Sequence, residues 1–251
     1  MQLYRVQAIV LNSYEMRDAH RVLTLYTREK GKVRAVAHGV AKPTSKKRGA
    51  VQPFCHTDFL LRRGRELDSV SQCEGREIFP ALWADLDLMS YAGHATGLVD
   101  RLTADGEPDQ HIFSLLLGIL RVLEKTKKPE LAIRSFELRL VSLLGYLPHL
   151  DSCTNCGETN LSPNSYFSPG AGGLVCRNCR TPGTADCFCG GEAVSVLKAL
   201  LNWELVTVER IRITRQAGAQ IKLIMTEYLK WLTERRSGPL EFMEKVRDYK
   251  P

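Results

Sequence analysis

The chain has 251 residues, of which 44% are hydrophobic, so it can bury a sizeable core in one large domain or two small ones. This composition excludes disorder as a description of the whole chain. Neither the first residues nor the longest apolar run, at Leu115–Leu120, has the length of a membrane span. We therefore expect a cytoplasmic protein whose eight cysteines remain thiols, so that a clustered set of them binds metal.

The formal net charge of +7 is concentrated near the N-terminus. Residues 1–80 contain 15 lysines and arginines against 8 acidic residues, whereas residues 81–251 contain 20 of each kind. A basic block joined to a charge-balanced remainder predicts a polyanion-binding module attached to a neutral body. The alternative is a solvated basic face that has no partner.

Short β-rich runs follow one another through the first 80 residues. These runs are Leu3–Leu11, Arg21–Arg28, Gly31–His38, Phe54–Arg62 and Ser69–Glu77. Five short strands predict a small barrel, and the five-stranded OB-fold is the natural candidate because it binds oligonucleotides. An SH3-like barrel would show the same strand pattern. We assign residues 1–80 to an OB-fold DNA-binding domain.

Helical periodicity of the apolar residues begins after Pro80. Five segments carry this pattern: Leu82–Leu102, Ile112–Leu123, Pro129–Gly145, Val194–Leu201 and Ile221–Leu232. Most of their apolar side chains should form a core, although an exposed part could receive a partner peptide. The predicted fold class is α+β. A helical domain at residues 81–251 follows the barrel and contains residues 151–191 as an inserted zinc module.

The strongest local signal is a pair of cysteine motifs. Cys153 and Cys156 enclose two residues, nineteen residues follow, and then Cys176 and Cys179 again enclose two. Two such pairs can supply four thiolates to one tetrahedral zinc ion, which leaves no position open for substrate, so we predict one structural Zn²⁺. A redox dithiol is the weaker alternative, because two pairs are present.

The remaining cysteines lie outside this pattern. Cys187 and Cys189 are separated by a single residue, which is a poor spacing for a zinc ligand pair, and we leave both out of the site. Cys55 and Cys73 fall in strand-like runs and are most simply small apolar core residues.

A second signal is the run from Lys32 to Arg48, which contains six basic residues and no acidic one. Nucleic acid is the favoured partner, and an anionic membrane is the lesser alternative because no amphipathic basic helix accompanies the charges. A second basic turn follows β-rich run four. The predicted DNA-binding residues are Lys32, Arg34, Lys42, Lys46, Lys47, Arg48, Arg62, Arg63 and Arg65. Four aromatic residues could stack bases, although each is more often core: Tyr14, Tyr26, Phe54 and Phe59.

Catalytic motifs are missing from the sequence. It contains no Walker loop, no G-x-S-x-G, and no H-x-E paired with P-C-x-x-C, and its six histidines are scattered. We therefore predict a protein that is not an enzyme and has no catalytic or cofactor-binding residues. A zinc-ribbon transcription regulator, or a non-catalytic subunit of a nucleic-acid enzyme, is the alternative.

Short motifs in both halves of the chain occur in the order typical of one family. The N-terminal motifs are Tyr14-Glu15-Met16-Arg17-Asp18, Val22-Leu23-Thr24-Leu25, Glu29-Lys30-Gly31-Lys32, Ala37-His38-Gly39-Val40 and Gln52-Pro53-Phe54. The later motifs are Leu144-Gly145-Tyr146-Leu147-Pro148, Leu150-Asp151-Ser152-Cys153, Cys156-Gly157, Phe167-Ser168 and Gly172-Gly173-Leu174-Val175-Cys176. In combination they resemble the RecO family of bacterial DNA recombination and repair proteins.

The resemblance implies an N-terminal OB-fold, a helical C-terminal domain and a zinc module that some relatives lack. It also implies a mediator of recombinational repair that binds single- and double-stranded DNA and anneals complementary strands. Such a mediator acts with RecR to load RecA onto DNA coated by single-stranded-DNA-binding protein, whose acidic C-terminal tail would dock on the helical domain. The pattern does not include Cys187 and Cys189, or the segment from Ser237 to Pro251.

Overall fold

The computed structural model describes residues 2–16, 20–40, 48–161, 165–181 and 185–233. The chain divides into two compact units, residues 1–125 and residues 126–251, and each is described by itself. In the described ranges, no helix is both long and apolar enough to cross a membrane.

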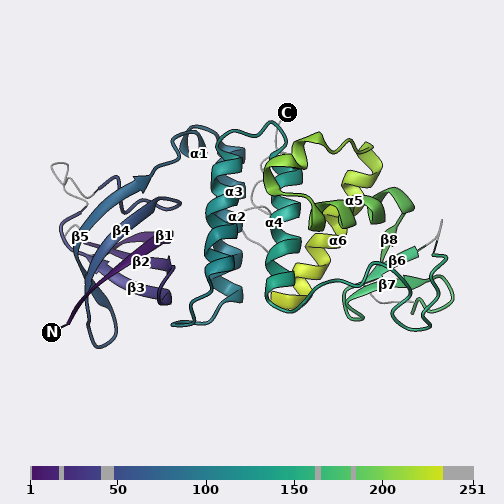
Figure 1. Cartoon of the computed structure of the whole chain (residues 1–251), viewed down its shortest axis with the longest axis horizontal. Coiled ribbons are helices and arrows are strands. Elements are labelled where there is room, and N and C mark those ends of the chain that lie inside the picture. Colours follow the sequence, from purple (N-terminus) through teal and green to yellow (C-terminus); the bar gives the residue numbers. More distant parts are fainter. Residues whose placement is uncertain (1, 17–19, 41–47, 162–164, 182–184, 234–251) are drawn as a thin grey trace. The chain divides into compact units, whose positions relative to one another are not determined.

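The first unit begins with five strands that close into a barrel (Figure 1). They are β1 (Leu3–Met16), β2 (His20–Thr27), β3 (Gly31–Ala37), β4 (His56–Arg62) and β5 (Asp68–Glu77). Four of the pairings are antiparallel, and a short parallel pairing of β3 with β5, at Ala35–Asp68 and Val36–Ser69, closes the ring. The order β1-β2-β3-β5-β4 confirms the predicted OB-fold and the α+β class.

Strand β1 is longer than the sequence pattern predicts, because it pairs with two neighbours. Residues Leu3 to Ile9 pair with β4, and after an irregularity between Val10 and Asn12 the strand continues to Met16 along β2. A bulge of this kind bends a strand, which lets one strand serve both sides of a small barrel.

The interior of the barrel holds one apolar cluster, built from alternate residues of the strands. Its buried members are Val6, Ala8, Val10, Leu23, Leu25, Ala35, Ala37, Val40, Val51, Phe59, Leu61 and Val70. Because side chains alternate along β3, Lys32 and Arg34 point away from this interior. The outward row formed by Ile9, Tyr26 and Lys32 is nevertheless buried.

Helices of the same unit bury that row. They are α1 (Ala81–Ala84), α2 (Leu86–Leu102) and α3 (Gln110–Leu123), and α2 contacts β1. The single helical segment predicted from Leu82 to Leu102 is broken at Asp85, whose extended backbone ends α1 and whose carboxylate accepts a hydrogen bond from the Leu88 N–H. Asp85 therefore acts as the N-cap of α2.

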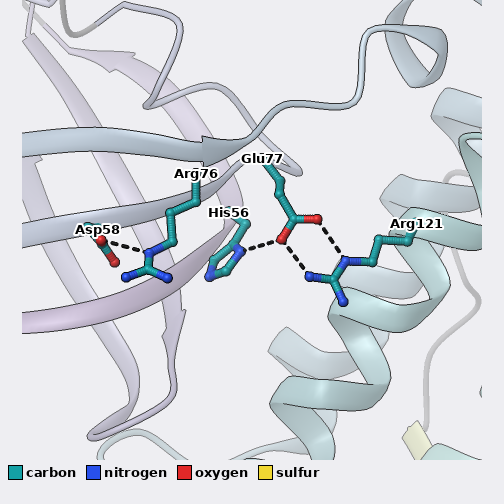
Figure 2. Close-up of polar contacts among 5 residues, drawn as sticks. All are labelled: His56, Asp58, Arg76, Glu77 and Arg121. Atoms are coloured by element: carbon teal, nitrogen blue, oxygen red, sulfur yellow. Dashed lines mark hydrogen bonds and ion pairs between the residues drawn. The ribbon is translucent and has the colours of Figure 1, made fainter.

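A polar cluster joins α3 to the barrel (Figure 2). Arg121 donates to the Glu77 carboxylate through Nε and Nη2, each at 2.7 Å. His56 Nδ1 lies 2.9 Å from Glu77 Oε1. An ionised carboxylate only accepts hydrogen bonds, so His56 Nδ1 is the donor to Glu77; the buried His56 ring also packs against Phe113, with 5.7 Å between ring centroids. Glu77, the last residue of β5, thus connects β4 and α3.

The second unit combines helices with a small sheet. The helices are α4 (Pro129–Leu143), α5 (Gly191–Asn202) and α6 (Arg215–Thr233), with a 3-10 turn at Leu205–Arg210, and the sheet has the order β7-β6-β8 from β6 (Ser165–Ser168), β7 (Gly173–Cys176) and β8 (Cys187–Cys189). Helices α5 and α6 pack on α4, and β8 contacts α6. Phe167 of β6 packs edge-on against Tyr228 of α6, 5.3 Å between ring centroids, which anchors the sheet to the helices.

We predict that Glu77 makes the first unit sensitive to acid. Hydrogen bonds from Arg121 lower the pKa of the Glu77 carboxyl from 4.5 to about 2. A carboxyl with a depressed pKa in the folded state stabilises the fold above its ordinary pKa, and this contribution is lost as the pH falls from about 4.5 toward 2. Glu77→Gln should therefore lower the free energy of unfolding at pH 7 by about 1–3 kcal/mol, and by progressively less below pH 4.5.

Urea unfolding of both proteins at several pH values measures this difference. Glu66→Gln removes an exposed carboxylate from the β4–β5 turn and serves as the matched control. A Glu77→Gln deficit that stays constant from pH 7 to pH 3 would show that the carboxylate charge does not carry the interaction.

Candidate metal centre and nucleic-acid interface

The four predicted cysteine ligands come together in the second unit. The sulfur atoms of Cys153, Cys156, Cys176 and Cys179 all lie within 4.8 Å of one another. The Cys156 and Cys176 sulfurs are 3.8 Å apart, and thiolates at ~2.3 Å from a tetrahedral ion have sulfur–sulfur edges of about 3.8 Å. The arrangement could therefore hold one metal ion with four protein ligands.

Tight backbone turns place each cysteine pair. Gly157 follows the first pair with φ +76°, and its N–H donates to the Cys153 carbonyl at 2.9 Å. In the second pair, the N–H groups of Cys179 and Arg180 both donate to the Cys176 carbonyl at 3.1 Å. A positive φ favours glycine, so this turn requires glycine at position 157.

The two turns are held against each other by backbone pairing. The Thr154 N–H donates to the Leu174 carbonyl, and the His149 carbonyl accepts from the Leu174 N–H. Gly173 lies so close to the backbone of His149 that a Cβ atom at position 173 would meet the His149 carbonyl oxygen at 2.4 Å. Any side chain at Gly173 would separate the two cysteine pairs.

The environment favours thiolate at the buried ligand. Burial opposes ionisation of Cys153, yet backbone N–H groups, chiefly that of Cys176 at 3.3 Å, donate to its sulfur and lower the pKa of the thiol from 9.0 to about 6. A thiolate is the form that binds metal. The donor set and its hydrogen bonds therefore fit a thiolate-bound ion.

The other cysteines have different surroundings. Cys187 and Cys189 both point into the core from β8, and burial raises the pKa of the Cys189 thiol to about 12. Neither belongs to the cluster of possible ligands. Cys55 is buried, and its burial raises the pKa of its thiol to about 11, whereas Cys73 packs against the barrel cluster.

The structure gives Lys32 a different setting from the DNA-binding surface that the sequence predicts. Its side chain is only 8% exposed, and Nζ donates to the carbonyl oxygens of Asp100 at 2.6 Å and Thr103 at 2.9 Å. The carboxylates of Asp100 and Asp105 lie 3.4 and 3.2 Å from the same nitrogen. Lys32 therefore caps the C-terminal end of α2, where the helix dipole favours a cation, and we remove it from the DNA-binding set.

The remaining described residues of that set are exposed, but they do not form one patch. Arg34 lies in the middle of β3, and Arg48 lies in the segment that enters β4 at His56. Arg62 is at the opposite end of β4, beside Leu3, and leads into the turn with Arg63 and Arg65. The seven residues of β4 separate the two basic ends by about 20 Å. Lys42, Lys46 and Lys47 lie outside the described residues.

Sequence reasoning missed two residues at the second basic end. A hollow there is lined by Tyr4, Lys30 and Arg63, and also by the carboxylates of Glu29 and Asp68, which balance the two cations; Lys30 Nζ lies 5.2 Å from the Tyr4 ring centroid. The signal was present, because Lys30 belongs to the turn that joins the second and third predicted strands, although nothing in the sequence brings that turn beside Arg63.

A larger groove over β1, β4 and β5 has mixed charge. Its charged lining residues are Arg5, Glu29, Asp58, Glu74 and Arg76. Arg76 donates to Asp58 at 2.7 Å (Figure 2), so this guanidinium is already paired. Three carboxylates against two guanidinium groups make this groove a poor path for a phosphate backbone.

The four candidate aromatic residues separate into exposed and buried ones. Tyr14 is 52% exposed, whereas Tyr26 and Phe59 are buried. Phe54 is buried against Trp83 of α1, with 5.5 Å between ring centroids. Among these four, Tyr14 alone offers a ring to a base.

Comparisons with known proteins match both parts of the chain. The family described as "Recombination protein O N terminal" matches residues 1–79, and "Recombination protein O C terminal" matches residues 84–239. A relative from Pelotomaculum thermopropionicum, named "DNA repair protein RecO", is 44% identical and the match covers 98% of this chain and 95% of the relative. Relatives of the same name from Desulforudis audaxviator and Desulforamulus reducens are 42% and 37% identical, with 98% of this chain and 98% and 96% of those relatives covered.

Fold and site together define a barrel protein with an OB-fold, a helical body and a four-cysteine module. The nearly full-length matches then settle the family. The chain belongs to the RecO family, whose matched members are named DNA repair proteins.

We predict that two cations on the same face of β3 contribute very different amounts to the free energy of unfolding. Lys32→Met leaves the α2 carbonyl oxygens without their buried donor and should lower the free energy of unfolding by about 1–3 kcal/mol. Arg34→Met changes an exposed residue and should shift it by less than about 0.5 kcal/mol. Thermal and urea unfolding of the two variants measures the contrast, and equal effects would contradict the structural assignment of Lys32.

Proposed function

We propose that the chain is a DNA-binding recombination mediator in recombinational DNA repair. It binds single- and double-stranded DNA, anneals complementary strands and, acting with RecR, helps to load RecA onto DNA coated by single-stranded-DNA-binding protein. It works in the cytoplasm and breaks no bonds in its substrate. The observation that carries the proposal is an OB-fold barrel with exposed arginines at both ends, in a chain that matches RecO proteins over nearly its full length.

In this proposal, DNA follows the barrel from one basic end to the other. Arg48 marks the first end and Arg62, Arg63 and Arg65 mark the second. Arg34 lies on β3 near the second end, because its neighbour Ala35 pairs with Asp68 and the next residue of β5, Ser69, pairs with Arg62. The two basic ends lie about 20 Å apart, which suits a single strand of several nucleotides, since OB-folds bind roughly 4–16 nucleotides; the strand contacts both ends without running through the mixed-charge groove over β1, β4 and β5. The predicted residues Lys42, Lys46 and Lys47 extend the cationic surface at the first end.

The four-cysteine site binds one structural Zn²⁺ in this proposal. Zinc prefers four thiolates in tetrahedral geometry, and four protein ligands fill its coordination sphere. The ion would cross-link the turn at Cys153–Cys156 to the turn at Cys176–Cys179, and so fix the module that lies between α4 and α5. It supplies stability, with no position for substrate.

The proposed protein partners are RecR and the acidic C-terminal tail of single-stranded-DNA-binding protein. Residues 81–251 carry equal numbers of acidic and basic residues, so this part of the chain has no charge excess with which to hold DNA. We therefore place the tail on the helical part, where a groove between helices with a nearby cation would take a terminal apolar residue and its carboxylate.

The metal assignment predicts about one equivalent of zinc in the purified protein. Cys176→Ser should lower the zinc content well below one equivalent and also lower the melting temperature, because zinc contributes about 10–16 kcal/mol of apparent binding energy in isolated finger peptides. The helical packing of the second unit should reduce that loss. Elemental analysis and thermal unfolding measure both effects, and Cys73→Ser, which lies in the barrel, is the matched control.

The DNA path predicts a steep dependence of affinity on salt. Each phosphate contact contributes about −0.7 on single strands, or about −0.9 on duplex, to the slope of log affinity against log salt. Changing Arg62, Arg63 and Arg65 together to Gln should flatten the slope by up to about 2 on single strands, and so should Lys46, Lys47 and Arg48 together to Glu.

Arg76→Gln is the control for this experiment, because Asp58 already pairs with that guanidinium. Fluorescence anisotropy with a labelled oligonucleotide at several salt concentrations gives the slopes. If neither triple variant changes affinity or slope, the DNA site does not lie on the barrel.

The mediator function is tested by annealing complementary strands that are coated with single-stranded-DNA-binding protein. The full chain should anneal the coated strands, and the two triple variants should anneal them more slowly in proportion to their loss of affinity. Truncation of the acidic tail of the coating protein should also slow annealing. Annealing of bare strands together with complete failure on coated strands would leave DNA binding intact and refute the mediator role.

A further inference from the structure

The outer face of the small sheet in the second unit carries an aromatic pair. Tyr166 of β6 and Phe188 of β8 are directly paired across the strands, with 5.8 Å between ring centroids in an edge-to-face arrangement. Their neighbours Phe167 and Cys187 point to the opposite, buried face, toward α6. Phe188 is 39% exposed although it lies at the centre of its strand.

An arginine extends this pair. The Arg180 guanidinium lies 4.3 Å from the centroid of the Tyr166 ring, so a planar cation and two rings stand side by side on one surface. Arg177 and Asn178 are exposed in the same cysteine turn. Between residues 159 and 185 the sequence has two arginines, Arg177 and Arg180, and no acidic residue. We refer to Tyr166, Phe188 and Arg180 as the stacking platform.

Burial of apolar area does not account for the platform, because the core of the module is on the other side of the sheet. Phe167, Cys187 and Cys189 fill that side and are each no more than 6% exposed. Exposed aromatic rings interleaved with arginine are the usual means of holding unpaired bases, since every base has a π-face and the guanidinium plane also stacks. Bases inside a duplex are already stacked and cannot use such a surface.

We propose that the stacking platform is a second nucleic-acid site, on which the four-cysteine module holds one or two unpaired bases of single-stranded DNA. The base stacks on Phe188 or on the open face of Arg180, and Arg177 contacts the adjacent phosphate. The site goes beyond the proposed DNA path, because it lies in the other compact unit and uses rings where the barrel uses cations.

The chemistry of the platform gives it a distinct signature. Phe188 carries no charge, so removal of its ring leaves the phosphate contacts of the arginines in place. Its contribution to affinity therefore depends on the presence of bases and hardly on salt, whereas the arginines of the barrel contribute through counterion release. The two sites can be separated by this difference.

The test compares full-length variants on single-stranded oligothymidylate. Phe188→Leu keeps an apolar side chain but removes the ring, and should weaken binding about five- to tenfold without changing the salt slope. Phe188→Tyr keeps the ring and should bind within about twofold of the unchanged protein. Trp203→Ala removes a comparably exposed aromatic residue, 45% exposed, from the same unit outside the module and should have no effect.

An oligonucleotide of the same length with abasic positions separates stacking from backbone contacts. All of these variants should bind it equally, because it offers no ring to Phe188. Photo-crosslinking with 5-iodouracil-substituted DNA, followed by peptide mapping, should place crosslinks on peptides that contain Tyr166 or Phe188.

Each outcome decides between the two sites. If Phe188→Leu binds oligothymidylate normally and no crosslink falls on the module, the platform is not a DNA site, whatever the barrel variants show. If Phe188→Leu weakens binding while the barrel triples leave affinity and salt slope unchanged, the platform stands and the barrel path is wrong. A folded full-length protein with no affinity for single strands overturns both.

Discussion

Closure of the barrel is the constraint on which the placement of charge depends. A closed barrel of five strands has one interior, so alternate side chains must be apolar and every cation on a strand must lie outside. The β3 sequence obeys this rule, because Ala35 and Ala37 fill the interior while Lys32 and Arg34 leave it. Helices α2 and α3 then cover part of the outer face, and the carbonyl groups at the end of α2 use Lys32 as a donor. The cations left for a polyanion are those that the helices do not reach.

The four-cysteine module solves a related problem on a smaller scale. A three-stranded sheet with strands of three or four residues cannot bury enough apolar area to hold its own loops. Two supports replace that missing core. One is the packing of Phe167, Cys187 and Cys189 toward α6, and the other is the cluster of four sulfurs at the far turns. The cysteines of β8 thus belong to the helical core, and the cysteines of the two turns form a cluster that could hold a metal ion.

Two physically different modes of binding DNA are combined in the proposed function. The arginines of the barrel neutralise phosphates, and their effect weakens as salt rises. The rings and arginine of the module stack on bases, which tolerates any sequence but requires unpaired ones. A protein that acts on strands before and after annealing benefits from this combination, because the phosphate contacts persist on duplex DNA while the stacking contacts are lost when the bases pair.

The sequence by itself determined the elements that depend on local chemistry. Strand alternation identified the barrel and helical spacing identified the helices. The spacing of Cys153, Cys156, Cys176 and Cys179 identified the four sulfurs that could hold a metal ion, because two tight turns each present two of them. Only the tertiary structure decided what became of individual exposed positions. It buried Lys32 under α2, placed Arg48 and Arg62 at opposite ends of β4, and set Arg180 on the ring of Tyr166. Spacing along a chain fixes which face a side chain takes, but the element that covers that face comes from elsewhere in the sequence, and only folding brings the two together.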